Sequence, residues 1–374
     1  MRNETPEARS AHRPALIRAS LMAVPALAAL LTMSISVAAP TISSISGDAT
    51  NGGKITISGS GFGTKARPDA LVWDTVDNSY GSAVNNATVT TGRSSVFIEN
   101  SNTSPVRFAK SSSLSRTPFS TLQYHGSGNS WLAHPVGAGG DNPPQSQRKL
   151  YIGWWVRFAT GPYENVNNAS HKFIRVWAGG DNDLRISWTQ RQLTVQNSNA
   201  GGSSAISSWA GDVWGTPGRW HLHEMWIDAD AGVIKTWVDG KIVHDFQSND
   251  TRYLKRTHPT GLNISLIGWN PSHGVTGGTN SFEMDDFVVD NTLARVVLSN
   301  SERWSDSAAQ VREYQPATSW SSNQITISAN PGQLSESEPM YLYVIAPDGS
   351  VNSTGFPVKD SGPRPEPPTS VSVQ

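Results

Sequence analysis

The chain has 374 residues, which is enough for two domains that each bury a core. Its 29 lysines and arginines nearly balance 30 aspartates and glutamates, so the charge gives no indication of a nucleic-acid partner. The 33 glycines, the 23 prolines and the lack of any sustained helical period predict an all-β fold, and the absence of cysteine excludes a disulfide framework.

Residues 1–39 have the pattern of a signal peptide. Four arginines lie in a basic leader, residues 19–39 are mostly apolar, and Val37-Ala38-Ala39 supplies small residues for cleavage. An uncleaved anchor is the alternative, because the apolar run is about long enough to span a bilayer. The small residues favour cleavage. Since exported animal proteins of this kind usually carry disulfides, we expect a bacterial protein, secreted or on the cell surface, without a membrane span after cleavage.

Two segments far apart in the chain have related strand patterns. Residues 40–66 alternate around Ile55 and Ile57 and end in Gly59-Ser60-Gly61-Phe62-Gly63, and residues 320–356 alternate similarly and include an Asp348-Gly349 turn. The first segment resembles the opening of an IPT/TIG domain, an immunoglobulin-like β-sandwich, and the second resembles its later half.

Neither segment is long enough to bury its own face, so we predict one discontinuous domain. Its parts are residues 40–66 and 312–359, and residues 67–311 form a larger domain inserted between them. Two separate appendages on the larger domain are the alternative. Residues 360–374 are rich in proline and polar residues, which predicts a disordered tail.

Within the insert, residues 149–158 (KLYIGWWVRF) predict a long buried strand whose adjacent tryptophans face opposite sides. Residues 170–178 and 183–189 predict two further strands. If these two form a hairpin, Arg175 and Arg185 lie on the same side, close to Trp177. Such a patch suits an anionic polysaccharide, because guanidinium groups pair bidentately with carboxylate or sulfate. The alternative is that both arginines pair with nearby acids such as Asp181 or Asp183.

Residues 218–246 (GRWHLHEMWIDADAGVIKTWVDGKIVHDF) predict two strands, a turn at Asp239-Gly240 and a third short strand. Alternation places Trp220, Leu222, Glu224 and Trp226 on one face of the first strand. On the second strand, Lys235 and Trp237 share a face. A face with tryptophan, glutamate and lysine is too aromatic for ordinary surface and too charged for a core, so we expect it to meet sugar.

The same residues resemble the tryptophan strand and W-V-D-G hairpin of concanavalin A-like lectin/glucanase jelly rolls. Phe282–Asp290 (FEMDDFVVD) is similar to the closing strand of that superfamily, which includes laminin-G-like modules and polysaccharide lyases. The resemblance implies a jelly-roll sandwich that binds its ligand on a concave sheet. It does not select one activity, because this fold hosts many.

Three functions remain open at this point: polysaccharide binding, cleavage of a uronic-acid polymer by a lyase, and a structural cell-surface module. We expect Trp226, Trp237 and Arg175 to face outward from one wet sheet. The candidate substrate-binding residues are Arg175, Trp177, Arg185, Glu224, Trp226, Lys235, Trp237 and Trp269.

A lyase needs a group that neutralises the carboxylate, a base for the C5 proton and an acid for the leaving oxygen. His171, Arg175, Tyr124 and His125 could take these roles. Any single histidine is more often structural, so the question whether the protein is an enzyme stays open.

Glycoside hydrolysis requires two carboxyl groups across the sugar bond. Jelly-roll glucanases supply them as Glu-x-Asp-x-(x)-Glu, and Glu283-Met284-Asp285 begins this pattern. The second glutamate is missing, and strict alternation points Asp286 to the opposite face. A hydrolase is therefore disfavoured relative to a lyase.

No cofactor is required by any of these functions. A structural Ca²⁺ is a weaker expectation, with Asp181 and Asp183 as ligands, because their oxygens are closely spaced after two glycines. Turn chemistry explains the same residues equally well.

Overall fold

The computed structural model describes residues 38–76, 98–99, 107–110, 116–117, 120–126, 130–134, 147–159, 172–178, 183–189, 192–197, 204–209, 215–256, 261–270, 280–306, 311–335 and 337–359. Within these ranges every regular element is a β-strand, and the sheets are antiparallel, so the fold is all-β as predicted. The described part of the chain contains no apolar helix of membrane-spanning length. The predicted signal peptide and tail lie outside it, apart from Ala38 and Ala39.

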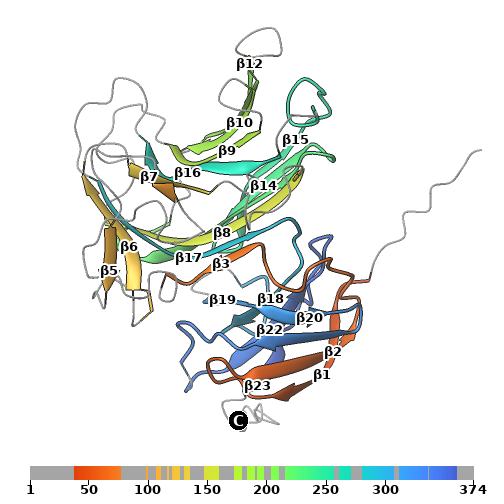
Figure 1. The fold of residues 1–374 in the computed structure, drawn as a ribbon. Coiled ribbons are helices and arrows are strands. Elements are labelled where there is room, and N and C mark those ends of the chain that lie inside the picture. Colours follow the sequence, from red (N-terminus) through yellow and green to blue (C-terminus); the bar gives the residue numbers. More distant parts are fainter. Residues whose placement is uncertain are drawn as a thin grey trace, which may run out of the picture. The chain divides into compact units, whose positions relative to one another are not determined.

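Two large sheets pack face to face, and we call this pair the larger sandwich (Figure 1). The seven-stranded sheet has the order β12 (Ser204–Trp209), β11 (Gln192–Asn197), β10 (Leu184–Thr189), β9 (Lys172–Ala178), β16 (Asn263–Asn270), β7 (Ser130–His134) and β4 (Ile98–Glu99). The eight-stranded sheet has the order β15 (Lys241–Gln247), β14 (Val233–Val238), β13 (Trp220–Asp228), β8 (Lys149–Phe158), β17 (Asn280–Asp290), β6 (Ser120–Gly126) and β5 (Arg107–Lys110), and β3 (Val72–Asp74) also pairs with β17.

The core of the larger sandwich follows from alternation along these strands. On β8 the inward residues include Ile152 and Trp154, and on β10 they include Ile186 and Trp188, all at most 2 % exposed. The rings of Trp154 and Trp188 meet edge to face with centroids 6.0 Å apart, a favourable geometry for aromatic pairs. Strand β8 has the predicted bounds, and its second tryptophan, Trp155, lies on the opposite face as predicted.

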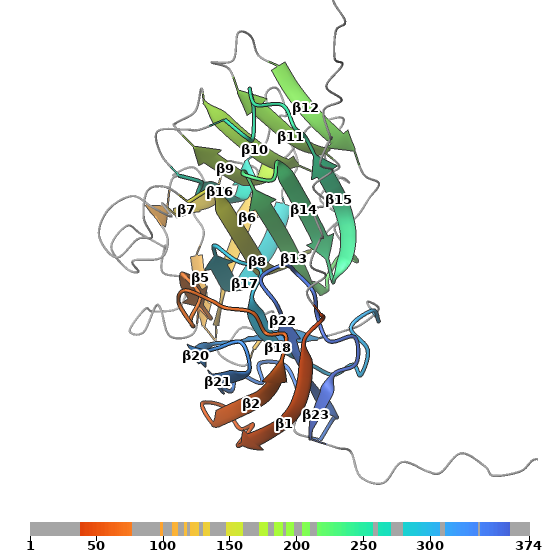
Figure 2. The same cartoon turned by 90° about the vertical axis from the view of Figure 1, so that its right-hand side faces the viewer.

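Two four-stranded sheets form a smaller sandwich (Figure 2). One has the order β1 (Thr41–Gly47), β2 (Lys54–Ser60), β21 (Gln324–Ser328) and β20 (Ala317–Trp320), and the other has β19 (Arg312–Gln315), β18 (Arg295–Ser299), β22 (Met340–Ile345) and β23 (Phe356–Lys359). Its core joins residues from both ends of the chain: Ile55 and Ile57 pack with Ile325, Leu298 and Leu342.

The division into domains stays a prediction, but strand pairing locates one junction. Strand β18 pairs with β19 and β22, so it belongs to the smaller sandwich although it precedes residue 312. The junction that fits this pairing lies between β17 and β18, close to Ala294, rather than at residue 311.

Candidate functional site

Two turns connect the strands around the tryptophans, one at residues 229–232 between β13 and β14 and one at Asp239-Gly240 between β14 and β15. Asp239 and Gly240 have positive φ, 50° and 75°, as expected for a tight turn with the Asp-Gly sequence. The register of β13 against β14 places Glu224 opposite Trp237 and Trp226 opposite Lys235. These residues share one face of the eight-stranded sheet, as alternation predicted. We call this outward face, which also carries Tyr151 and Trp155 from β8, the tryptophan face.

The tryptophan face does not meet solvent as we expected. Trp226 is only 7 % exposed and Glu224 only 4 %. Trp226 packs in a cluster with Tyr151 and Val288, and Tyr314 from the smaller sandwich packs against this cluster. The prediction of a wet surface is therefore wrong at Trp226 and Glu224, which the smaller sandwich covers, whereas Trp237 is half-buried.

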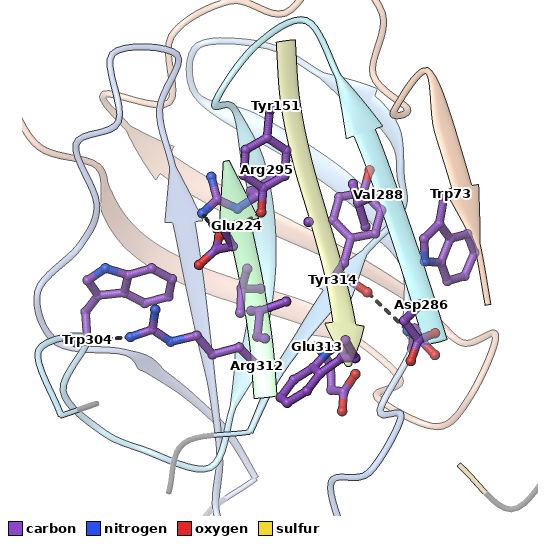
Figure 3. Close-up of a pocket in the computed structure, with 15 residues that line it drawn as sticks. Trp73, Tyr151, Glu224, Asp286, Val288, Arg295, Trp304, Arg312, Glu313 and Tyr314 are labelled. Carbon is purple, nitrogen blue, oxygen red and sulfur yellow. Dashed lines mark hydrogen bonds and ion pairs between the residues drawn. The ribbon is translucent and has the colours of Figure 1, made fainter. Parts of the chain in front are cut away.

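Buried polar groups on this face are paired across the boundary between the sandwiches (Figure 3). Glu224 Oε1 accepts hydrogen bonds from the Tyr151 hydroxyl at 2.7 Å and from Arg295 Nη2 at 2.8 Å. The Arg295 guanidinium also lies 4.4 Å from the centroid of the Tyr151 ring. Burial raises the pKa of Tyr151 well above its usual value, and its hydrogen bond to Glu224 acts in the same direction, so the phenol stays protonated.

A cavity of about 30 Å³ lies beside these groups, lined by residues of both sandwiches. It has room for about one or two water molecules, whereas small-molecule sites occupy about 300 Å³ or more. One wall is Arg312, whose guanidinium stacks 3.8 Å from the centroid of the Trp304 ring. The cavity is thus a packing gap in a charged interface and is too small for a sugar.

The closing strand of the larger sandwich departs from strict alternation. Strand β17 is bulged between Asp285 and Val288, and Asp286 has a φ of 45°. Asp285 lies opposite Trp155 in the register, and Asp286 lines the cavity together with Trp155. The prediction that Asp286 points to the opposite face from Asp285 is therefore wrong, because the bulge re-aims its side chain.

The seven-stranded sheet carries the second group of predicted residues. Strands β9 and β10 form the expected hairpin, with Arg185 opposite Trp177 and Ser187 opposite Arg175. Residues directly opposite each other share a face of the sheet, so Arg175, Trp177 and Arg185 lie together, and all three are half-buried. We call this outward surface the arginine face.

A hydroxyl and a side-chain amide each accept a hydrogen bond from one of the two guanidinium groups. Arg175 Nε donates to Ser187 Oγ at 3.2 Å, and Arg185 Nε donates to Gln196 Oε1 at 3.1 Å. Gln196 lies opposite Arg185 on β11. The arginine face and the tryptophan face belong to different sheets, so the prediction that Trp226, Trp237 and Arg175 share one sheet is wrong.

The four candidate lyase residues are not gathered on one sheet. Tyr124 and His125 lie on β6 of the eight-stranded sheet, opposite Phe282 and Ser281. Arg175 is on the seven-stranded sheet, and His171 lies outside the described residues. Trp269 is on β16, which pairs with β9, and so belongs to the same sheet as Arg175.

The remaining predicted residues have local roles or stay untested. Lys235 forms an exposed ion pair in which its Nζ lies 3.6 Å from Asp245 Oδ2. Asp183 is 6 % exposed, and Asp181 lies outside the described residues, so the calcium site stays a prediction. Within the described ranges, no three His, Cys, Asp or Glu side chains are grouped closely enough to hold a metal.

Sequence reasoning missed the smaller sandwich's contribution to the tryptophan face. Arg295, Arg312 and Tyr314 come from strands that showed no pattern linking them to β13. Tyr151 was within reach, because alternation along β8 puts it on the same side as Trp155.

These features define an all-β chain built of two sandwiches with a charged, aromatic boundary between them. No family model matches the sequence, and no curated protein matches it. Among solved structures, the cellulose-induced protein Cip1 is 16 % identical with a TM-score of 0.39, over 59 % of this chain and 97 % of that one.

Two other solved structures give similar values. Domain 4 of AbnA, an extracellular arabinanase from Geobacillus stearothermophilus in complex with arabinotriose, is 12 % identical with a TM-score of 0.33, over 60 % of this chain and 95 % of that one. The botulinum neurotoxin serotype D binding domain is 8 % identical with a TM-score of 0.36, over 74 % and 71 %. With TM-scores this low, these likenesses do not assign the chain to a family.

Proposed function

We propose that this protein binds an anionic polysaccharide on the arginine face of its seven-stranded sheet. The observation that carries the proposal is the placement of Arg175, Trp177 and Arg185 side by side on β9 and β10, half-buried and facing away from the core. The inward residues of the same strands, such as Val176 and Ile186, are fully buried. The arginine face is therefore the outward side of this sheet.

The chemistry of the arginine face fits an acidic sugar polymer. Guanidinium groups form paired hydrogen bonds with carboxylate or sulfate, and an indole ring supplies an apolar surface for a sugar ring. Arg175 and Arg185 are diagonal neighbours across the hairpin, which puts their backbones about 7–8 Å apart. Two guanidinium groups at this spacing can bind one acidic group between them or two neighbouring groups along a polymer.

A lyase acting on the same kind of polymer is the alternative activity. It would need an acid and a base beside the arginine face, and Tyr124 and His125 belong to the other sheet. Binding without cleavage is therefore the better supported function.

Affinity electrophoresis on alginate, glucuronan and a glycosaminoglycan tests the proposal. We expect at least one polymer to retard the wild-type protein, and Arg175→Ala/Arg185→Ala to lose about tenfold or more in affinity, since a charged hydrogen bond contributes about 1.5–3 kcal/mol. Arg67→Ala is the matched control, because Arg67 is an exposed arginine that is far from β9 in sequence and pairs with Asp69.

The same mixtures are followed at 235 nm, where the unsaturated product of a lyase absorbs. A rise in absorbance would establish the lyase instead of simple binding. Retardation that survives in the folded double variant would show that the arginine face is not the binding site. No retardation on any polymer would favour a structural module.

A further inference from the structure

Three ion pairs join the smaller sandwich, or the segment leading from it, to the larger one, and all are nearly excluded from water. Arg116 pairs with Glu313, Arg295 with Glu224, and Lys65 with Asp290. Side-chain exposure is at most 11 % for every partner. Exposed ion pairs contribute little to stability, but buried ones demand exact complementarity, because an unpaired charge left without water is costly.

Arg116 is the most completely enclosed of these charges. Its Nη1 and Nη2 donate to Glu313 Oε1 and Oε2 at 2.6 and 2.7 Å, and its Nε donates to Asp286 Oδ2 at 2.8 Å. The guanidinium lies 4.5 Å from the centroid of the Trp155 ring. Although burial alone lowers the pKa of Arg116, the charges of Asp286 and Glu313 raise it above the ordinary value, so the group stays charged.

The two acids that hold Arg116 belong to different sandwiches. Asp286 is on β17 of the larger sandwich and Glu313 is on β19 of the smaller one. Gln333, also in the smaller sandwich, donates from Nε2 to the Arg116 carbonyl at 2.6 Å and from its backbone N–H to Glu313 Oε1 at 3.0 Å. If the sandwiches separated, Arg116 could not keep its bonds to Asp286 of the larger sandwich together with its bonds to Glu313 and Gln333 of the smaller one.

Apolar packing and chain connection act in the same direction. Trp226 and Val288 of the larger sandwich are at most 7 % exposed under the contact with Tyr314 and Leu293. Strand β2 precedes the larger sandwich in sequence and β21 follows it, yet the two pair directly. Opening the contact would therefore expose apolar area and leave several charges half-solvated at once, which disfavours a partly opened state.

From these contacts we propose that the smaller sandwich is a fixed cover of the tryptophan face, and that the two sandwiches unfold as one unit coupled through Arg116. This inference is independent of what the arginine face binds. It means that the tryptophan face is a permanent internal boundary and not a second surface waiting for a ligand.

Native-state hydrogen exchange on the full chain tests the coupling. Ile325→Val removes one methylene from the core of the smaller sandwich, and Ile186→Val makes the same change in the larger one; both side chains are fully buried. Such a change shifts an opening equilibrium by about two- to tenfold. We expect each variant to speed exchange of the slowest amides in both sandwiches by the same factor. If Ile325→Val speeds exchange only in β2, β21 and β22, the sandwiches open independently and the proposal is wrong.

A second experiment isolates Arg116. The triple variant Arg116→Met/Asp286→Asn/Glu313→Gln removes the guanidinium charge together with the charges of the two carboxylates that accept its hydrogen bonds. In this background we expect Ile325→Val to change exchange in the larger sandwich by less than twofold. Arg67→Ala/Asp69→Asn, which removes an exposed ion pair, is the control and should leave the coupling intact. Coupling that is unchanged in the triple variant would show that Arg116 is not the connecting residue.

Discussion

Acid should destabilise this protein through two histidines enclosed in the larger sandwich. His223 is fully buried, with its ring stacked 5.5 Å from that of Trp154, and His244 is 1 % exposed. Burial lowers the pKa of His223 to about 3 and that of His244 to about 4, from an ordinary value of 6.5. Both imidazoles are therefore neutral in the folded protein at neutral and mildly acidic pH.

The sign of the effect follows from proton uptake. Between about pH 4 and pH 6.5 the unfolded chain protonates these histidines and the folded protein does not, so the free energy of unfolding falls as the pH falls. At pH 5 an unfolded imidazole with a pKa of 6.5 gains about 2 kcal/mol from protonation. The two histidines together should lower the free energy of unfolding by about 4 kcal/mol between pH 8 and pH 5.

Two buried carboxyl groups change the stability with the opposite sign. Burial raises the pKa values of Glu283 and Asp290 despite their ion pairs, so these carboxyls favour the folded state as the pH falls. A single variant separates the histidine contribution from theirs. Urea unfolding of wild type and His223→Gln at several pH values should give slopes of the free energy against pH that differ by about 1.2 kcal/mol per pH unit between pH 5 and 6.

His221 provides a control of opposite sign. Although burial lowers its pKa, the hydrogen bond and charge of Asp239 raise it overall, so its contribution is present below about pH 6.5 and is lost as the pH rises through the folded value. His221→Gln should therefore cost more stability at pH 6 than at pH 8. Equal slopes in wild type and His223→Gln would refute the assignment of a neutral buried imidazole.

Three further substitutions should act locally, each measured by urea unfolding. Gly240→Ala should destabilise the protein by more than about 1 kcal/mol, because φ is 75° and the added Cβ would overlap Arg312 Nη1; an unchanged midpoint would contradict this. Tyr151→Phe should cost about 1–3 kcal/mol by removing the hydroxyl that donates to Glu224, and a neutral result would mean water replaces it. Asn352→Ala should cost a similar amount, since its side chain bonds three backbone groups near β22, and exchange of the Val344 amide should accelerate.

Local sequence patterns were sufficient for the strands and for the β14–β15 turn. Alternation along residues 149–158 and 220–228, with Asp239-Gly240 between strands, identified both the elements and the side chains that share a face. Alternation could not identify what covers a face. The tryptophan face is covered by β18 and β19. These strands lie more than 60 residues after β13 in the chain, and their sequences carry no signal of that contact.

Two residues show the other limits of pattern reasoning. Asp286 was misplaced because one bulge in β17 changes the side on which a residue lies, and a bulge has no reliable signature in a single sequence. Arg116 was missed because it precedes β6 in a stretch without periodicity, where no rule connects an arginine to acids 170 and 197 positions away.

The charged side chains of the two aromatic faces are held in different ways. On the tryptophan face, Glu224 accepts from Arg295, so its buried carboxylate is neutralised only when the smaller sandwich is in place. On the arginine face, a hydroxyl and a side-chain amide are among the groups that bond to Arg175 and Arg185. A sheet whose charges are paired within the chain is suited to an internal boundary, and neighbouring arginines on the outward side of a sheet are suited to an anionic ligand. The ligand surface of this protein is therefore expected where arginines accompany a single tryptophan, and not where tryptophans are most numerous.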